Sequence, residues 1–85
     1  MPKVEMYTTN FCPYCVRALQ FLTSREVEVE RIYVDRDPSQ FETMLQRSMG
    51  RRTVPQIFID DFHVGGYDDL MALHRAGKLE PLLQQ

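Results

Sequence analysis

The sequence predicts an α/β fold in which three or more helices flank a mixed four-stranded sheet, in the order β-α-β-α-β-β-α. The first observation is that short runs rich in strand formers alternate with stretches of helical spacing. The second is that a helix separates the first two strands, and such a crossover makes them parallel. The third is a tight turn between the last two strands, which makes that pair antiparallel. A sheet that holds both kinds of pair is mixed.

The first half of the chain supplies a strand, a helix and a second strand. Residues 4–7 form a short run of strand formers, and residues 16–22 then have helical spacing. Residues 27–34 alternate less cleanly, but they are rich in strand formers and predict the second strand. The helix has an apolar stripe that should face the core, formed by Cys15, Leu19 and Leu22.

A second helix follows the second strand. Asp37 is suited to the N-cap, and Pro38 fits the first helical turn, where a backbone N–H is not needed. Gly50 is expected to end this helix. The side chains predicted to be buried share one stripe: Phe41, Met44, Leu45 and Ser48.

A β-hairpin and a last helix complete the chain. Residues 56–59 and 62–64 read as two strands joined by a tight turn at residues 60–61. Gly65 and Gly66 close the hairpin, and the last helix should open near Tyr67. Its first turn holds Asp68 and Asp69, whose negative charge suits the positive end of the helix dipole. Leu70 and Leu73 should face the core. The whole arrangement is thioredoxin-like.

The length and charge of the chain limit the classes of function that it can have. A chain of 85 residues predicts one small domain over residues 1–85. Its 12 acidic and 10 basic residues are interspersed and give a net charge of −2, which argues against nucleic acid as a partner. Apolar stretches long enough to cross a bilayer and a signal-peptide pattern are both lacking in the sequence, so we expect a cytoplasmic protein without a membrane partner.

The strongest local motif is Cys12-Pro13-Tyr14-Cys15, which contains both cysteines of the chain. It lies where the first strand should give way to the first helix. If Cys12 is at the helix N-terminus, free backbone N–H groups and the helix dipole favour the reactive thiolate over the thiol. Cys15 would point inward. This spacing therefore favours a redox-active thiol pair.

Two other uses of a CxxC motif are weaker. A structural disulfide across so short a loop removes little entropy from the unfolded chain. A zinc site would need about two more ligands, and His63 and His74 lack the spacing of a known finger. These histidines are better read as surface or core-edge residues.

The sequence resembles the glutaredoxin family over essentially its whole length. Three blocks in this order carry the resemblance: Tyr7-Thr8 with Cys12-Pro13-Tyr14-Cys15, then Thr53-Val54-Pro55-Gln56-Ile57-Phe58-Ile59, then Gly65-Gly66-Tyr67-Asp68-Asp69-Leu70. The resemblance is to small bacterial dithiol forms. It implies a monomeric glutathione-disulfide oxidoreductase that reduces protein disulfides and glutathionylated proteins. Glutathione is the implied co-substrate, with no tightly bound cofactor and no metal.

The resemblance also implies roles for individual residues. Cys12 attacks a substrate sulfur to form a mixed disulfide, and Cys15 resolves that intermediate unless glutathione does so. A cis peptide bond before Pro55 would expose the Val54 backbone to an extended tripeptide, which could pair with it as an added strand. Residues expected to bind glutathione are Tyr14, Arg52, Thr53, Val54, Pro55, Gly66, Asp68 and Asp69.

Each charged group of glutathione has an expected partner. The helix N-terminus after Gly66 can receive a carboxylate through free N–H groups. Asp68 or Asp69 could accept the α-ammonium of the γ-glutamyl end. Arg51 and Arg52 could pair with the glycine carboxylate.

Two positions depart from the family pattern. Many glutaredoxins have a lysine two residues after the tyrosine of the first block, where this chain has Thr9. Glu42 lies where some relatives have a neutral or basic side chain near the glycine carboxylate. The residues expected to compensate are Arg36, Gln40 or Arg52.

Two other functions share parts of the pattern. A thioredoxin-like electron donor, loaded by a flavin-dependent reductase, would need the CxxC but no site for a γ-glutamyl group. An iron–sulfur carrier would hold a cluster with Cys12 of two subunits and two glutathiones, but Pro13 and Cys15 resemble the redox-active branch. For the oxidoreductase, the candidate protein substrates are ribonucleotide reductase and glutathionylated proteins.

Overall fold

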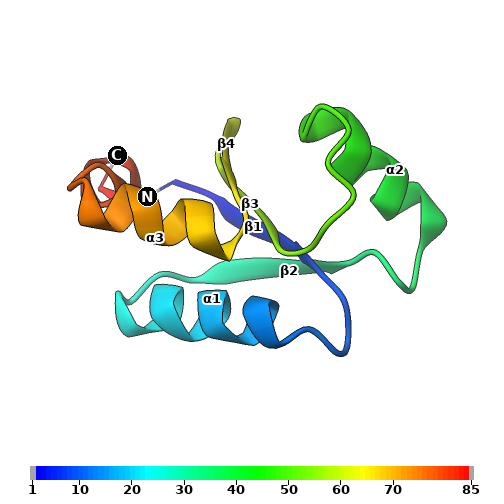
Figure 1. Cartoon of the computed structure of the whole chain (residues 1–85), viewed down its shortest axis with the longest axis horizontal. Helices are drawn as coiled ribbons and strands as arrows, with labels where there is room; N and C mark the ends of the chain where they lie inside the picture. The colour runs from blue at the N-terminus through cyan, green and yellow to red at the C-terminus, as the bar shows by residue number, and fades with distance from the viewer. Residues whose placement is uncertain (1, 85) are drawn as a thin grey trace.

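The computed structural model describes residues 2–84 and contains a mixed four-stranded sheet with helices on both faces (Figure 1). The strand order is β2-β1-β3-β4. The strands are β1 (Val4–Thr8), β2 (Val29–Tyr33), β3 (Gln56–Ile59) and β4 (Phe62–Gly65). The helices are α1 (Pro13–Ser24), α2 (Pro38–Arg47), α3 (Tyr67–Arg75) and α4 (Leu79–Leu83). The predicted thioredoxin-like fold is confirmed.

Sheet pairing follows from the connections. The crossover through α1 places β2 parallel to β1, whereas β3 pairs antiparallel with β1 and with β4. Asp60, in the two-residue turn of the β3–β4 hairpin, has a φ of 52°. β2 is two residues shorter at its start than the predicted run 27–34, and one residue shorter at its end. Helix α1 begins before the predicted residues 16–22 because Pro13 already occupies its first turn, and it ends at Ser24, beyond the predicted end.

Alternation along the strands divides the core into two parts. Val4 and Met6 of β1 lie on the face covered by α1 and α3, together with Ile57 and Ile59 of β3. On the opposite face, Tyr7 of β1 and Phe58 of β3 pack in a second cluster with Val34 and with Met44 of α2. Figure 1 shows α1 and α2 on opposite sides of the sheet. The sheet is therefore buried on both faces, which fixes its register.

Most residues of the predicted helical stripes are buried or half-buried. Cys15 and Leu22 of α1 are buried, and Leu19 is partly buried beside Ala18, a buried residue that the predicted stripe omits. In α2, Met44 and Ser48 are buried while Phe41 and Leu45 are half-buried. Asp37 caps α2 by accepting a hydrogen bond from the Ser39 backbone N–H at 3.0 Å.

Helix α2 ends close to the predicted glycine. Its last helical residue is Arg47, and the Gly50 N–H donates to the Leu45 carbonyl oxygen at 2.8 Å. Gly50 has a φ of 94°, a left-handed conformation that favours glycine. The chain then enters residues 51–55, which carry no regular secondary structure and lead into β3.

The short helix α4 was not predicted. It spans five residues and includes Pro81, so its sequence offers too few turns for helical periodicity to be detected. Leu79 and Leu83 are nonetheless buried in the cluster formed by α1 and α3. Within the described residues, no helix is long and apolar enough to cross a membrane.

Candidate active site

The Cys12 sulfur lies at the N-terminus of α1. Cys12 is the N-cap residue, with extended backbone angles of φ −141° and ψ 100°. Its Sγ accepts a hydrogen bond from the Cys15 backbone N–H at 3.2 Å. Pro13 occupies the first helical position and has no N–H to donate. The sulfur therefore takes the place of a capping oxygen, where a hydrogen bond and the helix dipole both stabilise a negative charge.

Cys15 has the opposite environment. Its side chain is 3% exposed, and both cysteines are free thiols in the structure. Burial foremost, and then the neighbouring Cys12 sulfur, raise the pKa of the Cys15 thiol to about 11, although Thr8 opposes the shift in part. Cys15 is therefore protonated near neutral pH while Cys12 is half-exposed at the helix tip.

The segment before β3 passes beside the reactive sulfur. The Val54 carbonyl oxygen lies 3.8 Å from Cys12 Sγ. The Val54–Pro55 peptide bond is cis, as the family resemblance implies. A residue 42 positions along the chain thus presents its backbone next to Cys12. This contact joins the thiol to the groove described next.

A hollow of about 220 Å³ opens beside this contact. It gathers residues from the start of α1, from residues 51–55 and from the start of α3. Its lining consists of Tyr14, Arg51, Thr53, Val54, Pro55, Gly66, Tyr67, Asp68 and Asp69. We call this hollow the groove. It contains seven of the eight residues predicted to bind glutathione, and Arg52 is the exception.

Arg52 points elsewhere. Its guanidinium carbon lies 5.3 Å from the centre of the Phe41 ring on α2, in a cation–π contact. Arg51 lines the groove instead, and its Nη1 lies 3.1 Å from Asp69 Oδ2. Arg36, another residue expected to compensate for Thr9, donates to Asn10 Oδ1 at 2.7 Å, next to the motif.

The two acidic residues of α3 differ in their partners. Asp69 accepts a hydrogen bond from the Gly66 N–H at 2.8 Å and pairs with Arg51. The Gly66 hydrogen bond, foremost, and Arg51 lower the pKa of Asp69. Asp68 is exposed, and within residues 2–84 no hydrogen bond or ion pair engages its carboxylate. Asp69 therefore organises the helix terminus, and Asp68 is available to a ligand.

Gly65 allows these groups to approach one another. Its φ is 106°, and a Cβ added there would overlap the Asp69 carboxylate and lie 2.8 Å from Arg51 Nη1. No side chain larger than hydrogen fits this position without moving the ion pair. The requirement for glycine here comes from the groove as well as from the hairpin.

Two aromatic rings form one wall of the groove. Tyr14 is 53% exposed, and its ring centre lies 6.1 Å from that of Tyr67. The Arg17 guanidinium carbon lies 5.4 Å from the Tyr14 ring centre. The sequence analysis did not single out Tyr67 as a binding residue, and it named Arg51 only together with Arg52 as a partner for the glycine carboxylate. Tyr67 could have been expected, because the first residue of a helix that follows a glycine pair lies beside any ligand bound at that terminus.

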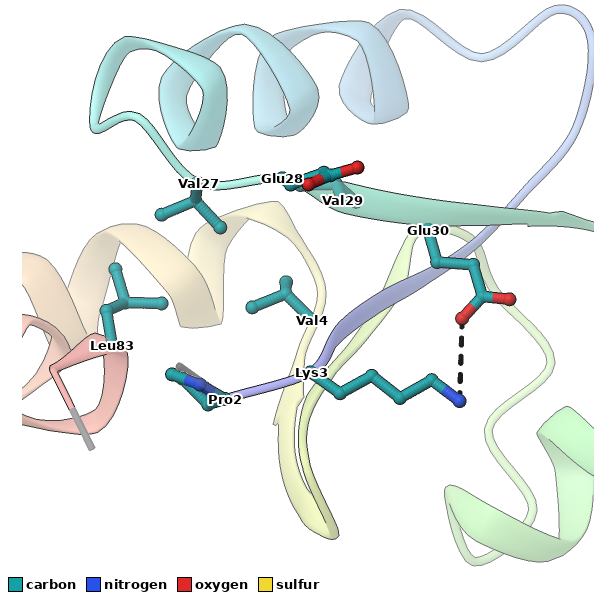
Figure 2. Close-up of a pocket in the computed structure, with 8 residues that line it drawn as sticks. All are labelled: Pro2, Lys3, Val4, Val27, Glu28, Val29, Glu30 and Leu83. Atoms are coloured by element: carbon teal, nitrogen blue, oxygen red, sulfur yellow. Dashed lines mark ion pairs between the residues drawn. The ribbon is translucent and has the colours of Figure 1, made fainter.

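A larger hollow, of about 470 Å³, lies at the other end of β1, where Val4 begins the strand. Figure 2 shows Val27, Val4 and Leu83 around it, with the Lys3–Glu30 ion pair at its edge. Cysteine is missing from its lining, so it contributes nothing to thiol chemistry. Size alone does not identify the site, and the reactive sulfur does.

In the described part of the chain, no three side chains of histidine, cysteine, aspartate or glutamate gather closely enough to hold an ion. His63 is half-buried in the sheet, with Nε2 2.6 Å from Gln56 Oε1. His74 packs edge-on against Phe21, with ring centres 4.9 Å apart.

Comparison with known proteins finds glutaredoxins, both as a family model and as individual relatives. The glutaredoxin family model matches residues 4–64. Glutaredoxin 3 of Escherichia coli K12 is 50% identical over 84 residues, which cover 99% of this chain and 100% of that protein. A glutaredoxin of Pseudomonas aeruginosa is 52% identical over 83 residues, covering 98% of each chain.

Solved structures agree with the sequence relatives. The crystal structure of a buckwheat glutaredoxin–glutathione complex superposes with a TM-score of 0.87 at 31% identity, covering 98% of this chain and 77% of that one. The solution structure of glutaredoxin from Brucella melitensis gives 0.84 at 47% identity, covering 98% and 89%.

Proposed function

Since the chain belongs to the glutaredoxin family, whose members are thiol-disulfide oxidoreductases, we propose that it uses glutathione to reduce glutathionylated proteins and protein disulfides. One observation carries the proposal. The Cys12 sulfur, at the helix tip, lies 3.8 Å from the Val54 carbonyl oxygen at the edge of the groove. A ligand in this groove would have its own sulfur beside the reactive thiol.

The first reaction is deglutathionylation. The Cys12 thiolate attacks the glutathione sulfur of the substrate, so that a Cys12–glutathione bond forms and the protein thiolate leaves and takes up a proton. A second glutathione, as thiolate, then attacks the bound glutathione sulfur. This step releases glutathione disulfide and regenerates the Cys12 thiolate. Cys15 is not needed for this reaction, because the second glutathione resolves the mixed disulfide.

The second reaction is reduction of a protein disulfide. Cys12 attacks one sulfur of the substrate and forms a mixed disulfide, releasing the other sulfur as a thiol. Cys15 then gives up its proton and attacks Cys12 Sγ, which releases the second substrate thiol and leaves a Cys12–Cys15 disulfide. Two molecules of glutathione reduce that disulfide and become glutathione disulfide. The side chains of the two cysteines interact with each other, which supports an attack by the Cys15 sulfur on Cys12 Sγ.

The groove supplies recognition of glutathione. The Val54 backbone pairs with the cysteinyl residue of the extended tripeptide. Free N–H groups at the start of α3 receive the γ-glutamyl carboxylate, and Asp68 accepts its α-ammonium. Tyr14, Thr53 and Pro55 enclose the peptide.

The groove geometry narrows the choice between the expected charged partners. Asp68 is free to receive a ligand, whereas Asp69 is occupied by Gly66 and Arg51. Of the two arginines expected to pair with the glycine carboxylate, Arg51 lines the groove, but it lies beside Asp69 at the start of α3, so we assign it to the γ-glutamyl carboxylate instead.

A coupled assay tests the function. The protein is mixed with glutathione, glutathione reductase and a glutathionylated peptide, and NADPH consumption is followed. The same assay is run with thioredoxin reductase in place of glutathione and its reductase. We expect turnover in the first assay and none in the second. Turnover with thioredoxin reductase alone would favour the thioredoxin-like electron donor instead.

A further inference from the structure

Gln56 is a fully buried amide at the start of β3, and each polar end of its side chain has a partner. Its Nε2 lies 3.0 Å from the Thr53 carbonyl oxygen and 3.3 Å from the Thr53 hydroxyl oxygen. Its Oε1 lies 2.6 Å from His63 Nε2. Thr53, Gln56 and His63 are thus linked in one series of hydrogen bonds.

Which atom donates in each of these hydrogen bonds follows from the chemistry of the groups. A carbonyl oxygen accepts and never donates, so the Gln56 atom that faces the Thr53 carbonyl must be the amide nitrogen. The Gln56 oxygen therefore faces His63, and this oxygen also only accepts. His63 Nε2 must then carry a hydrogen. Reversing the Gln56 amide would place two oxygens against each other.

His63 is itself held in place by the sheet. It lies on β4 directly opposite Phe58, and the two rings stack with their centres 4.8 Å apart. Burial foremost, and then the Arg51 charge, lower the pKa of His63, whereas Asp69 acts in the opposite sense. A neutral ring with hydrogen on Nε2 has no hydrogen on Nδ1, so the tautomer is defined.

The hydrogen-bond series that begins at His63 ends at Thr53, in the groove. Thr53 and Val54 both line it, within the irregular residues 51–55. Such a segment has no sheet or helix hydrogen bonds to hold its backbone, so side-chain contacts must do so. The double contact from Gln56 fixes the Thr53 carbonyl and hydroxyl oxygens, one residue before the Val54 backbone.

We propose that His63 is a positioning residue for glutathione recognition: its Nε2–H orients the Gln56 amide, which holds Thr53 and thereby the Val54 backbone in place for the ligand. His63 lines no part of the groove and acts only through Gln56. This proposal rests on the proposed function, because it assigns the groove to glutathione.

His63→Phe tests the donor. Phenylalanine keeps a ring to stack on Phe58 but has no Nε2–H. We expect the KM for a glutathionylated peptide to rise about three- to tenfold while kcat changes less than about twofold, the pattern of lost uniform binding. The rate at which iodoacetamide alkylates Cys12 should not change. An unchanged KM in a folded His63→Phe protein overturns the proposal.

His74→Phe is the matched control. His74 also packs a ring against a phenylalanine, Phe21, but it lies near the end of α3 and outside the groove. Its KM should equal that of the wild type. An equal rise in KM in both variants would mean that loss of any sheet-packed or helix-packed histidine ring is responsible, which also overturns the proposal.

A second variant tests the path through Gln56. Gln56→Met keeps the length of the side chain but removes both polar atoms. If His63 acts only through Gln56, the KM of the His63→Phe/Gln56→Met double variant should equal that of Gln56→Met alone. Additive increases in KM would show that His63 acts by another route and would contradict the proposal.

The tautomer can be measured without glutathione. In a ¹⁵N NMR spectrum of the reduced protein at neutral pH, we expect His63 to carry hydrogen on Nε2 and none on Nδ1. Hydrogen on Nδ1 alone would overturn the proposal whatever the turnover. A correct tautomer in a protein without glutathione-dependent turnover would support the His63–Gln56 link and reject the proposed function, so the two failures can be told apart.

Discussion

The thiol pair and the groove beside it are built in different ways. Cys12 and Cys15 are three residues apart, and their different environments follow from their positions on one helix, the first at its tip and the second on its buried side. The groove is assembled from three segments, which are joined only when β3 lies beside β1 and α3 beside α1. Reactivity in this protein is thus a local property, whereas recognition is a tertiary one.

This difference predicts that variants of the helix tip and variants of the groove lose different properties. Changes at the helix tip should remove the chemistry without affecting the shape of the groove. Changes in the groove should weaken binding while the reactivity of Cys12 toward a small alkylating agent is preserved. Each prediction below tests one side of this separation, in order of decreasing effect.

The largest effect is expected for Cys12→Ser. A serine hydroxyl does not ionise near neutral pH, so no nucleophile remains to form the mixed disulfide. Both deglutathionylation and protein disulfide reduction should fall to the uncatalysed rate in the coupled assay. The variant should still bind glutathione, which isothermal titration can check. Residual turnover above the uncatalysed rate would show that Cys15 can replace Cys12.

The second-largest effect is expected for Gly65→Ala, which should lower stability and weaken binding in the groove. The left-handed φ of 106° costs a residue with a Cβ about 1–3 kcal/mol of stability. The added Cβ would also displace the Asp69–Arg51 ion pair, so the KM for a glutathionylated peptide should rise. Urea unfolding and steady-state kinetics measure the two effects.

Gly77→Ala is the control for that experiment. Gly77 has a φ of 71°, but no atom lies within 4 Å of the position that a Cβ would take. Its alanine variant should lose stability and keep its KM. If the KM rises equally in both variants, loss of stability and not displacement of the ion pair explains the effect.

A smaller, pH-dependent effect is expected for Asp69→Ala. The variant loses the acceptor for the Gly66 N–H and the partner of Arg51, which should cost about 0.5–1 kcal/mol for a side chain that is half-exposed. Because the Gly66 hydrogen bond and Arg51 lower the pKa of Asp69, the unfolded chain binds a proton more readily than the folded protein does. The stabilisation is therefore present above the unfolded pKa and is lost as the pH falls through the folded one.

Unfolding free energies of the wild type and Asp69→Ala, measured from pH 7 to pH 2, test this sign. The difference between the two proteins should be constant near neutral pH and should shrink as the pH falls below about 4. A difference that grows with acid would show that the Asp69 carboxylate is not stabilised by its neighbours.

The smallest effect is expected for Thr9→Lys. A lysine at this position, between β1 and the motif, adds a charged donor that can reach a carboxylate of glutathione. One such contact at a partly exposed position lowers the KM by about two- to tenfold. Thr9→Met, of similar length without charge, is the control. An unchanged KM in Thr9→Lys would mean that Arg51 or another cation already fills this role.

The sequence predicted the helix tip more completely than it predicted the groove. The cap at Cys12 depends on neighbouring residues, and so does the inward position of Cys15. The choice between Arg51 and Arg52 does not, because the two arginines lie in an irregular segment and only tertiary packing decides which of them faces the groove. The structure places Arg52 over Phe41 and Arg51 beside Asp69.

Two other features show what sequence reasoning could and could not detect. Asp69 stands three residues after the N-cap Gly66, the spacing at which an acidic side chain reaches back to the cap N–H, so its structural role was predictable. The contact between His63 and Gln56 was not, because it depends on the register of β4 against β3 and on the bulge between Ile57 and Phe58. Irregular pairing of this kind has no signature in the sequence.

The claim that reactivity is a local property, set by the different positions of Cys12 and Cys15 on one helix, is tested most directly by Cys15→Ser, with both reactions measured on the same protein preparation. Deglutathionylation of a peptide should continue, because a second glutathione resolves the Cys12 mixed disulfide. Reduction of a protein disulfide should be lost, because it requires the buried second thiol. The account predicts a large difference between the two rates relative to the wild type. An equal loss of both activities in a folded Cys15→Ser protein would contradict it.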